Sequence, residues 1–255
     1  MTETQMMIHQ AITYATVAHM GQTRKGTLIP YIVHPFEVAQ ILTAAGADAE
    51  VICAGLLHDT VEDTDASLED IRTLFGDKVA SLVDGASEDK SKTWQERKQH
   101  TIDYLAKEAD LDELLLACAD KLANMRAMAH DYAAIGDQLW ERFNAGRNQL
   151  SWYYGSLTEV LEPLHEYEMY WELVNLYQEV FVKYYRRLDT DELIQDNGIE
   201  LHTLSRDYPQ WIPTKNLDPN DLSSSSLYDE MSKQASNALE EQWQAEYRSN
   251  HPEIQ

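Results

Sequence analysis

The sequence has few of the residues that break helices or form disulfides. Its 255 residues include only 10 glycines and 7 prolines, which favours helices over turn-rich β structure. The two cysteines, Cys53 and Cys118, both lie in apolar stretches, so we expect buried thiols in a reducing compartment. No apolar run approaches the roughly 20 residues of a membrane helix. The opening "MTETQMMIHQ" lacks the basic start and apolar block of a signal peptide. We therefore expect a cytoplasmic protein.

Positive charge is also scarce. The chain has 20 Lys and Arg against 44 Asp and Glu, which gives a formal net charge of −24 at pH 7. Because negative charge repels phosphate backbones and anionic lipids, the composition argues against polymeric nucleic acid or a membrane as a partner. A small anionic substrate remains compatible, since it responds to the local charge of its site more than to the net charge.

What the sequence does contain is helical periodicity. The hydrophobic content of 44% is sufficient for one large domain with an appendage. Apolar residues recur at helical spacings from the N-terminus onward, and two aromatic-rich helices are expected at about 138–164 and 166–188. Beyond residue 188, Pro, Asn and Ser punctuation indicates an irregular, partly flexible appendage with a serine run at 223–226. A short helix is expected from about 228 to 247.

Ionisable residues interrupt three of the predicted helices. His34 stands beside Pro35 at the start of one, His58 and Asp59 end another, and Asp120 lies within a third, otherwise apolar helix. A histidine at a helix start is usually structural, and an isolated His-Asp pair is common, so each residue alone is weak evidence. A buried, unpaired carboxylate would cost several kcal/mol. Imidazoles and carboxylates together suit a divalent cation, so these side chains could surround one metal ion.

Three stretches carry a resemblance to a known family. In chain order, "AHMGQTRKGTLIPYIVHPFEVAQIL", "AGLLHDTVEDTDASLEDIRTLFGDKVASLVDGASEDKS" and "ADKLANMR" resemble the HD hydrolase domain of the RelA/SpoT alarmone family. They are most similar to its small, hydrolase-only members, including the metazoan SpoT-homologue type. The resemblance covers about 11–126 and continues more weakly to about 185. It implies an all-α HD-domain hydrolase fold. We assign this domain to 1–188, and the punctuation after it assigns an irregular or helical C-terminal appendage to 189–255.

The resemblance also implies roles for the ionisable residues. The implied manganese ligands are His34, His58, Asp59 and Asp120. The acid pair Glu62 and Asp63 would serve the catalytic water. The pair follows the His-Asp dipeptide by about one helical turn, so its carboxylates can point to the same site. A carboxylate beside metal-bound water can accept a proton from it, because the metal lowers the pKa of that water.

Members of this family remove pyrophosphate from the 3′ position of ppGpp or pppGpp, so the resemblance implies a small nucleotide as substrate. The residues that match the family's substrate-binding motifs are Arg24, Lys25, Lys92, Arg97, Lys98 and Asn124. For Arg97 and Lys98, a solvated helix face is an alternative of similar weight.

The chain also departs from the family pattern. Ala123 stands where the family has a histidine, and Ala127 where it has a threonine that contacts the base, so guanine specificity is not implied. The loop "RKGTLIPY" is one residue longer than the common form. No stretch resembles the family's synthetase domain, so we expect degradation of the substrate. Two alternatives stay open: hydrolysis of another phosphorylated nucleotide, such as NADPH or an adenosine alarmone, and a non-catalytic HD module that senses a nucleotide.

Overall fold

A computed structural model describes residues 2–214 and 217–251 of the chain. These residues form two compact units. Unit 1 comprises Met1–Asn144 and Gly155–Leu176, and unit 2 comprises Ala145–Tyr154 and Tyr177–Gln255. Residues 1 and 252–255, at the outer ends of the two predicted segments, lie outside the described residues. The predicted division at residue 188 stays a prediction.

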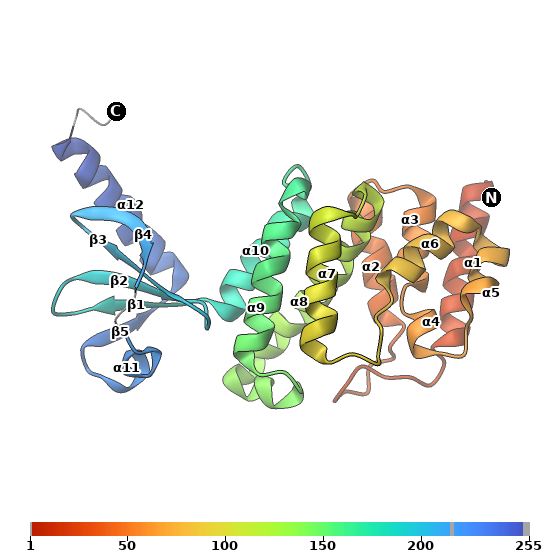
Figure 1. The fold of residues 1–255 in the computed structure, drawn as a ribbon, viewed down its shortest axis with the longest axis horizontal. Coiled ribbons are helices and arrows are strands. Elements are labelled where there is room, and N and C mark those ends of the chain that lie inside the picture. The colour runs from red at the N-terminus through yellow and green to blue at the C-terminus, as the bar shows by residue number, and fades with distance from the viewer. Residues whose placement is uncertain (1, 215–216, 252–255) are drawn as a thin grey trace. The chain divides into compact units, whose positions relative to one another are not determined.

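Unit 1 is helical (Figure 1). Its elements are α1 Glu3–Ala18, α2 Val33–Ala44, α3 Ala49–Leu57, α4 Thr60–Asp63, α5 Leu68–Phe75, α6 Asp77–Ala86, α7 Trp94–Lys107, α8 Leu111–Ile135, and the 3₁₀ turns η1 Gly136–Arg142 and η2 Glu162–Leu164. Helices α9, Arg147–Val160, and α10, Glu168–Phe181, contribute residues to both units. The helix starts follow the sequence: Ser67 and Thr93 begin α5 and α7 in capping boxes, each satisfying backbone donors that the first turn leaves open.

Helix α3 lies at the centre of unit 1. Every residue from Val51 to Leu57 is buried, and α3 packs against α1, α2, α6 and α8. The approach is closest at Gly55, where an added Cβ would lie 2.6 Å from Leu42 Cδ1 on α2. A larger residue at this position would require the Leu42 side chain or the helix to shift. This close packing brings the start of α2 and the end of α3 beside the middle of α8.

Unit 2 contains a five-stranded antiparallel sheet with the order β4-β3-β2-β1-β5 (Figure 1). Its elements are β1 Lys183–Arg187, β2 Glu192–Asp196, β3 Leu201–Ser205, β4 Tyr208–Pro213, α11 Pro219–Ser224, β5 Tyr228–Met231 and α12 Lys233–Asn250. The prediction of an all-α fold is therefore wrong for this part of the chain. The predicted irregular appendage is also wrong here, and the helix expected to reach residue 188 ends before β1.

The sheet has a core on each face. Consecutive strand residues point to opposite faces, so Leu193 and Ile194 of β2 enter different clusters. Leu193 packs with the fully buried Trp243 of α12, whereas Ile194 packs with Tyr185 and with Leu222 of α11. Two helices thus cover apolar strand residues that a solvated appendage would expose.

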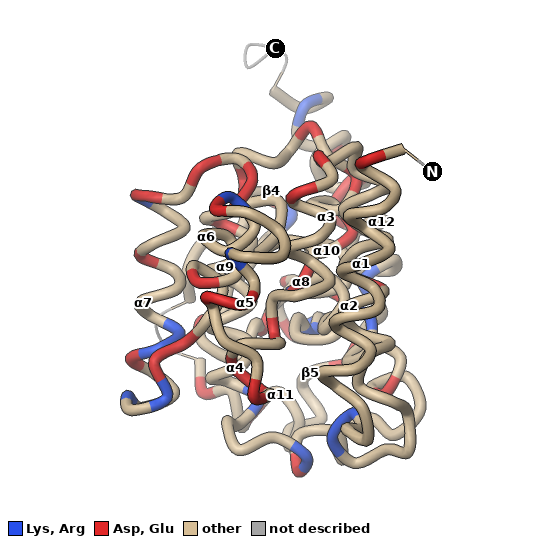
Figure 2. Tube along the Cα trace, turned by 90° about the vertical axis from the view of Figure 1, so that its right-hand side faces the viewer, with Lys and Arg blue, Asp and Glu red and all other residues tan. Residues whose placement is uncertain are grey.

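Acidic residues recur along the helices, and basic residues gather at fewer places (Figure 2). This distribution follows from the excess of 44 acidic over 20 basic residues. Within the described ranges, no helix combines the length and the apolar character that a membrane span requires.

Candidate metal centre and adjoining cavity

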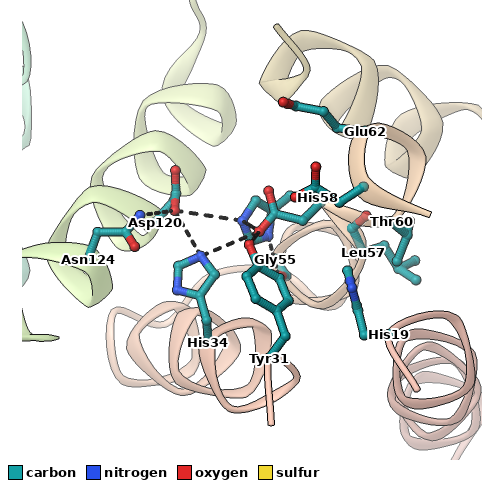
Figure 3. A network of polar contacts seen from close by, with 12 residues as sticks. His19, Tyr31, His34, Gly55, Leu57, His58, Thr60, Glu62, Asp120 and Asn124 are labelled. Atoms are coloured by element: carbon teal, nitrogen blue, oxygen red, sulfur yellow. Dashed lines mark hydrogen bonds and ion pairs between the residues drawn. The ribbon is translucent and has the colours of Figure 1, made fainter. Parts of the chain in front are cut away.

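Three helices bring two imidazoles and a carboxylate together in unit 1 (Figure 3). His34 lies in the first turn of α2, His58 follows the last residue of α3, and Asp120 lies in the middle of α8. One ligand atom from each lies within 4.8 Å of the other two. His34 Nε2 is 3.1 Å from Asp120 Oδ1, and His58 Nε2 is 3.7 Å from the same oxygen. This group could hold a metal ion.

Asp59 extends the group from the turn between α3 and α4. Its Oδ2 atom lies 3.0 Å from His58 Nε2 and 3.6 Å from His34 Nε2. The hydroxyl of Tyr31 donates a hydrogen bond to the same Oδ2 at 2.5 Å. The structure therefore brings all four predicted ligands together, and their role as ligands stays a prediction.

The hydrogen bonds of His58 leave one ring nitrogen for a ligand bond. Its Nδ1 lies 2.8 Å from the Gly55 carbonyl oxygen, which can only accept, so Nδ1 carries a proton. The other nitrogen, Nε2, is buried and makes no well-aligned hydrogen bond within the described part of the chain. A fixed Nδ1–H with an inward Nε2 is the arrangement of metal-binding histidines. The donor set thus fits a divalent cation.

Burial and neighbouring charges shift the pKa values of His58, Asp59 and Asp120. Burial alone would lower the pKa of His58, but the charge of Asp59 and contacts with both carboxylates raise it well above the ordinary value. Burial opposes ionisation of Asp120, yet the Lys121 ammonium and the two imidazoles hold the pKa of that carboxyl well below its usual range. The pKa of Asp59 is lowered in the same way, against burial, by His58. The two carboxylates could therefore ligate a cation, which would have to displace the proton that they favour on His58.

The predicted catalytic acids lie on α4, one turn beyond Asp59. Glu62 is mostly buried, and Figure 3 shows its carboxylate extending to the side on which Asp120 lies. Lys90, from the loop between α6 and α7, donates to the Glu62 carbonyl oxygen at 2.9 Å and to Asp63 Oδ1 at 3.0 Å. The lysine therefore ties both acids to the loop that enters α7.

A cavity of about 310 Å³ adjoins the centre between α6, α7 and α8. His58 and Asp120 form part of its wall. The wall contains five carboxylates and three basic side chains, Lys92, Arg97 and Lys121, a balance of 3 − 5 = −2. A divalent cation at the centre would bring this balance to zero and would make the cavity more favourable for an anion.

The predicted substrate-binding residues fall into two groups on either side of Asp120. Arg24, on the loop before α2, donates to Asn124 Oδ1 at 3.4 Å, and Asn124 donates to Asp120 Oδ1 at 2.8 Å. Lys25 is exposed on the same loop. The structure therefore brings Arg24 and Asn124 together beside the centre.

The second group lies on the opposite, cavity side. Arg97 and Lys98, in the second turn of α7, both contact Glu88, and exposed Lys92 lies 4.0 Å from Asp89. Burial and the charge of Lys121 lower the pKa of Lys98. The alternative of a solvated helix face does not describe these two side chains, of which only 23% and 17% are exposed.

Three residues of the site were not identified from the sequence: Tyr31, Glu88 and Lys90. Each lies inside a stretch that carries the family resemblance, but no local pattern marks it. Their contacts span 9 to 28 residues along the chain. Periodicity and spacing describe neighbours within one element, so pairings of this length become visible only in the folded chain.

Comparisons with known proteins agree with the HD-domain resemblance seen in the sequence. A family model described as an HD domain matches residues 11–150. A GTP pyrophosphokinase of Streptomyces coelicolor is 38% identical over 212 residues, covering 76% of this chain and 24% of that protein. The zebrafish (Danio rerio) protein named guanosine-3′,5′-bis(diphosphate) 3′-pyrophosphohydrolase MESH1 is 42% identical over 122 residues, covering 46% of this chain and 66% of that protein.

A solved structure is also similar. It is described as a metazoan ortholog of SpoT that hydrolyses ppGpp, and it superposes with a TM-score of 0.57 at 32% identity. The match covers 68% of this chain and 94% of that one. The aligned part of this chain spans about a quarter of the Streptomyces protein and just under two thirds of the zebrafish one.

Proposed function

Because the chain belongs to the HD-domain family, we propose that unit 1 is a metal-dependent pyrophosphohydrolase that removes the 3′-pyrophosphate of a ppGpp-type alarmone. One observation carries the proposal: two imidazoles and two carboxylates converge beside a cavity, with His58 Nε2 turned inward and buried. The zebrafish protein is named for this reaction, and the metazoan SpoT ortholog is described as hydrolysing ppGpp.

His34, His58, Asp59 and Asp120 would hold the metal, which we propose to be manganese. Mixed nitrogen and oxygen donors suit a divalent ion of the first transition row. Bound there, the ion would supply a water of lowered pKa and polarise a phosphoryl oxygen. Tyr31 supports the set from outside, since its hydroxyl fixes Asp59 Oδ2. We also propose a cytoplasmic location, in keeping with two buried, free cysteines.

Glu62 and Asp63 would take the proton of the attacking water. Both acids lie on α4 about one turn after Asp59, a spacing at which their carboxylates could point to the same end of the centre. Lys90 contacts both residues and would limit their motion, so that the accepting oxygen stays close to the water. Holding the base in place before the reaction reduces the reorganisation that the transition state requires.

The two basic groups beside Asp120 would contact the two ends of the nucleotide. The first group consists of Arg24 and Lys25 from the loop before α2, together with Asn124 of α8. The second group consists of Lys92, just before α7, and of Arg97 and Lys98 in α7. A nucleotide with phosphates at both its 3′ and 5′ positions presents charge in two directions, which matches basic groups on two sides of one centre.

A substrate panel tests the proposal. Manganese-loaded protein is incubated separately with ppGpp, pppGpp, pppApp and NADPH, and the products are separated by ion exchange. We expect inorganic pyrophosphate from the guanosine substrates, and no product after Asp59→Ala, whose circular dichroism should stay helical. Release from NADPH or pppApp alone would assign another substrate. No product from any of the four would favour the nucleotide-sensing module.

A further inference from the structure

Glu88 occupies a position between two cations at the wall of the cavity. Its Oε2 lies 3.0 Å from Arg97 Nη1, and its Oε1 lies 2.6 Å from Lys98 Nζ. The backbone N–H of the same residue donates to Glu62 Oε2 at 3.3 Å. Both carboxylate oxygens and the backbone of Glu88 are thus held, one end by the basic residues of α7 and the other by a proposed catalytic acid.

The arrangement has the form of an occupied anion site. A carboxylate bridged by a guanidinium and an ammonium presents two oxygens in the way that a phosphate group would. Only 16% of the Glu88 side chain is exposed, so the pairing is shielded from solvent more than a surface ion pair. Figure 2 shows acidic and basic positions interspersed along the loop before α7 and its first turns.

We propose that Glu88 is an internal substitute for a substrate phosphate: its carboxylate fills the site between Arg97 and Lys98 and is displaced when the substrate binds. The inference rests on the proposed function, because it takes the displacing anion to be a phosphate group of the nucleotide. Glu88 then sets a threshold for binding, since a monoanion must be exchanged for a group of higher charge.

The exchange makes Glu88 a residue that determines specificity. A terminal phosphate group carries about 1.5 to 2 negative charges near neutral pH, whereas the carboxylate carries one. A ligand with a terminal phosphate can therefore replace Glu88, while a ligand with a single carboxylate or a neutral group gains nothing by doing so. The cost appears as a lower apparent affinity: if Glu88 fills the site about nine-tenths of the time, the apparent Kd is about tenfold higher.

The alternative is a structural clamp. In that case Glu88 serves to orient Arg97 and Lys98 for the substrate, and its removal loosens both cations. The two roles predict opposite signs for the effect of Glu88→Gln on anion affinity. This opposition allows a binding experiment to decide between them without any turnover.

The experiment is a calorimetric titration of inorganic pyrophosphate into wild-type protein, Glu88→Gln and a matched control in a fixed excess of free magnesium. The control is Asp103→Asn, which removes one negative charge from an exposed position on α7, away from Arg97 and Lys98. We expect the Kd of pyrophosphate to fall about three- to tenfold in Glu88→Gln and to stay within about twofold in the control. A Glu88→Gln/Arg97→Gln double variant should lose this gain.

An unchanged or higher Kd in folded Glu88→Gln would overturn the proposal in favour of the clamp. Glu88→Asp provides a second measurement should Glu88→Gln fail to fold, because a side chain shorter by one methylene cannot bridge both cations. Its Kd should lie below that of the wild type, and a higher value would equally overturn the proposal. The result is separate from the proposed function: tighter pyrophosphate binding without ppGpp hydrolysis would refute the activity alone, and hydrolysis without tighter binding would refute the role of Glu88 alone.

Discussion

Replacing Tyr31 by phenylalanine removes one hydroxyl from the edge of the metal centre and leaves the ring in place. That hydroxyl donates to Asp59 Oδ2 at 2.5 Å, the oxygen that also lies 3.0 Å from His58 Nε2. A hydrogen bond to a charged group contributes about 1.5–3 kcal/mol. Outer partners of metal ligands typically account for about ten- to a hundredfold in metal affinity. We therefore expect Tyr31→Phe to weaken manganese binding by about ten- to a hundredfold.

The assay is a calorimetric titration of manganese into metal-free Tyr31→Phe, compared with the wild type and with Tyr14→Phe. Tyr14 of α1 is a suitable control because its ring packs edge-on against Phe75 of α5, away from the metal centre. Activity of Tyr31→Phe should be low at limiting manganese and recover at saturating manganese. Wild-type affinity in Tyr31→Phe would refute the idea that this hydroxyl fixes a metal ligand.

Three further outcomes follow from the same geometry. Neighbouring carboxylates raise the pKa of His58 in the metal-free protein, so a metal must displace a proton and manganese affinity should increase with pH. Titrations in buffers of different ionisation enthalpy should show proton release, and a pH-independent affinity would contradict this. Gly55→Ala places a Cβ 2.6 Å from Leu42 Cδ1 and should lower the free energy of unfolding by about 1–3 kcal/mol in urea, whereas a stability equal to the wild type would show that α2 can move away. Arg126→Met removes a two-point ion pair with Glu172 at 2.7 Å and should lower the free energy of unfolding by about 1 kcal/mol after allowance for solvent screening, with kcat/KM unchanged. A loss of activity at full stability would instead give Arg126 a role in substrate binding.

The candidate metal centre could be proposed from the sequence because its residues break a local rule. Asp120 interrupts an apolar helix, and His58 with Asp59 ends another, so each is visible as an exception to its own periodicity. Of the helices that position them, α8 is long and begins in a capping box at Asp110, whereas α2 and α3 are shorter and have no side-chain cap. The packing that brings them together depends on Gly55, whose role the sequence alone does not indicate.

The sheet of unit 2 was missed for a physical reason. β1 has the sequence "KYYRR" and follows an amphipathic, aromatic-rich helix, with no glycine or proline between the two. In the sequence alone, the helical periodicity therefore continues into β1. The strands of this sheet have 4 to 6 residues each. In segments this short, the alternation of apolar and polar residues cannot be distinguished from the pattern of a helix or a loop. Their stability comes from pairing with other strands and from Trp243 of α12, which are interactions distant in sequence.

The salt links around Glu88 and Lys90 illustrate the same limit inside the candidate site. Arg97 and Lys98 were identified as basic residues on a helix, but their partner lies in the preceding loop. Opposite charges nine or ten residues apart across a loop have no fixed spacing rule, unlike pairs one helical turn apart. Folded geometry is needed to show that both cations share one carboxylate.

We propose that one divalent ion, held by His34, His58, Asp59 and Asp120, is required to release pyrophosphate from ppGpp. The most direct measurement determines bound manganese and pyrophosphate release on the same samples, for the wild type, for Asp120→Ala and for chelator-treated wild type. We expect about one manganese ion per chain together with pyrophosphate release in the wild type, and the loss of both in the other two samples. Continued release of pyrophosphate by Asp120→Ala without bound metal would contradict it.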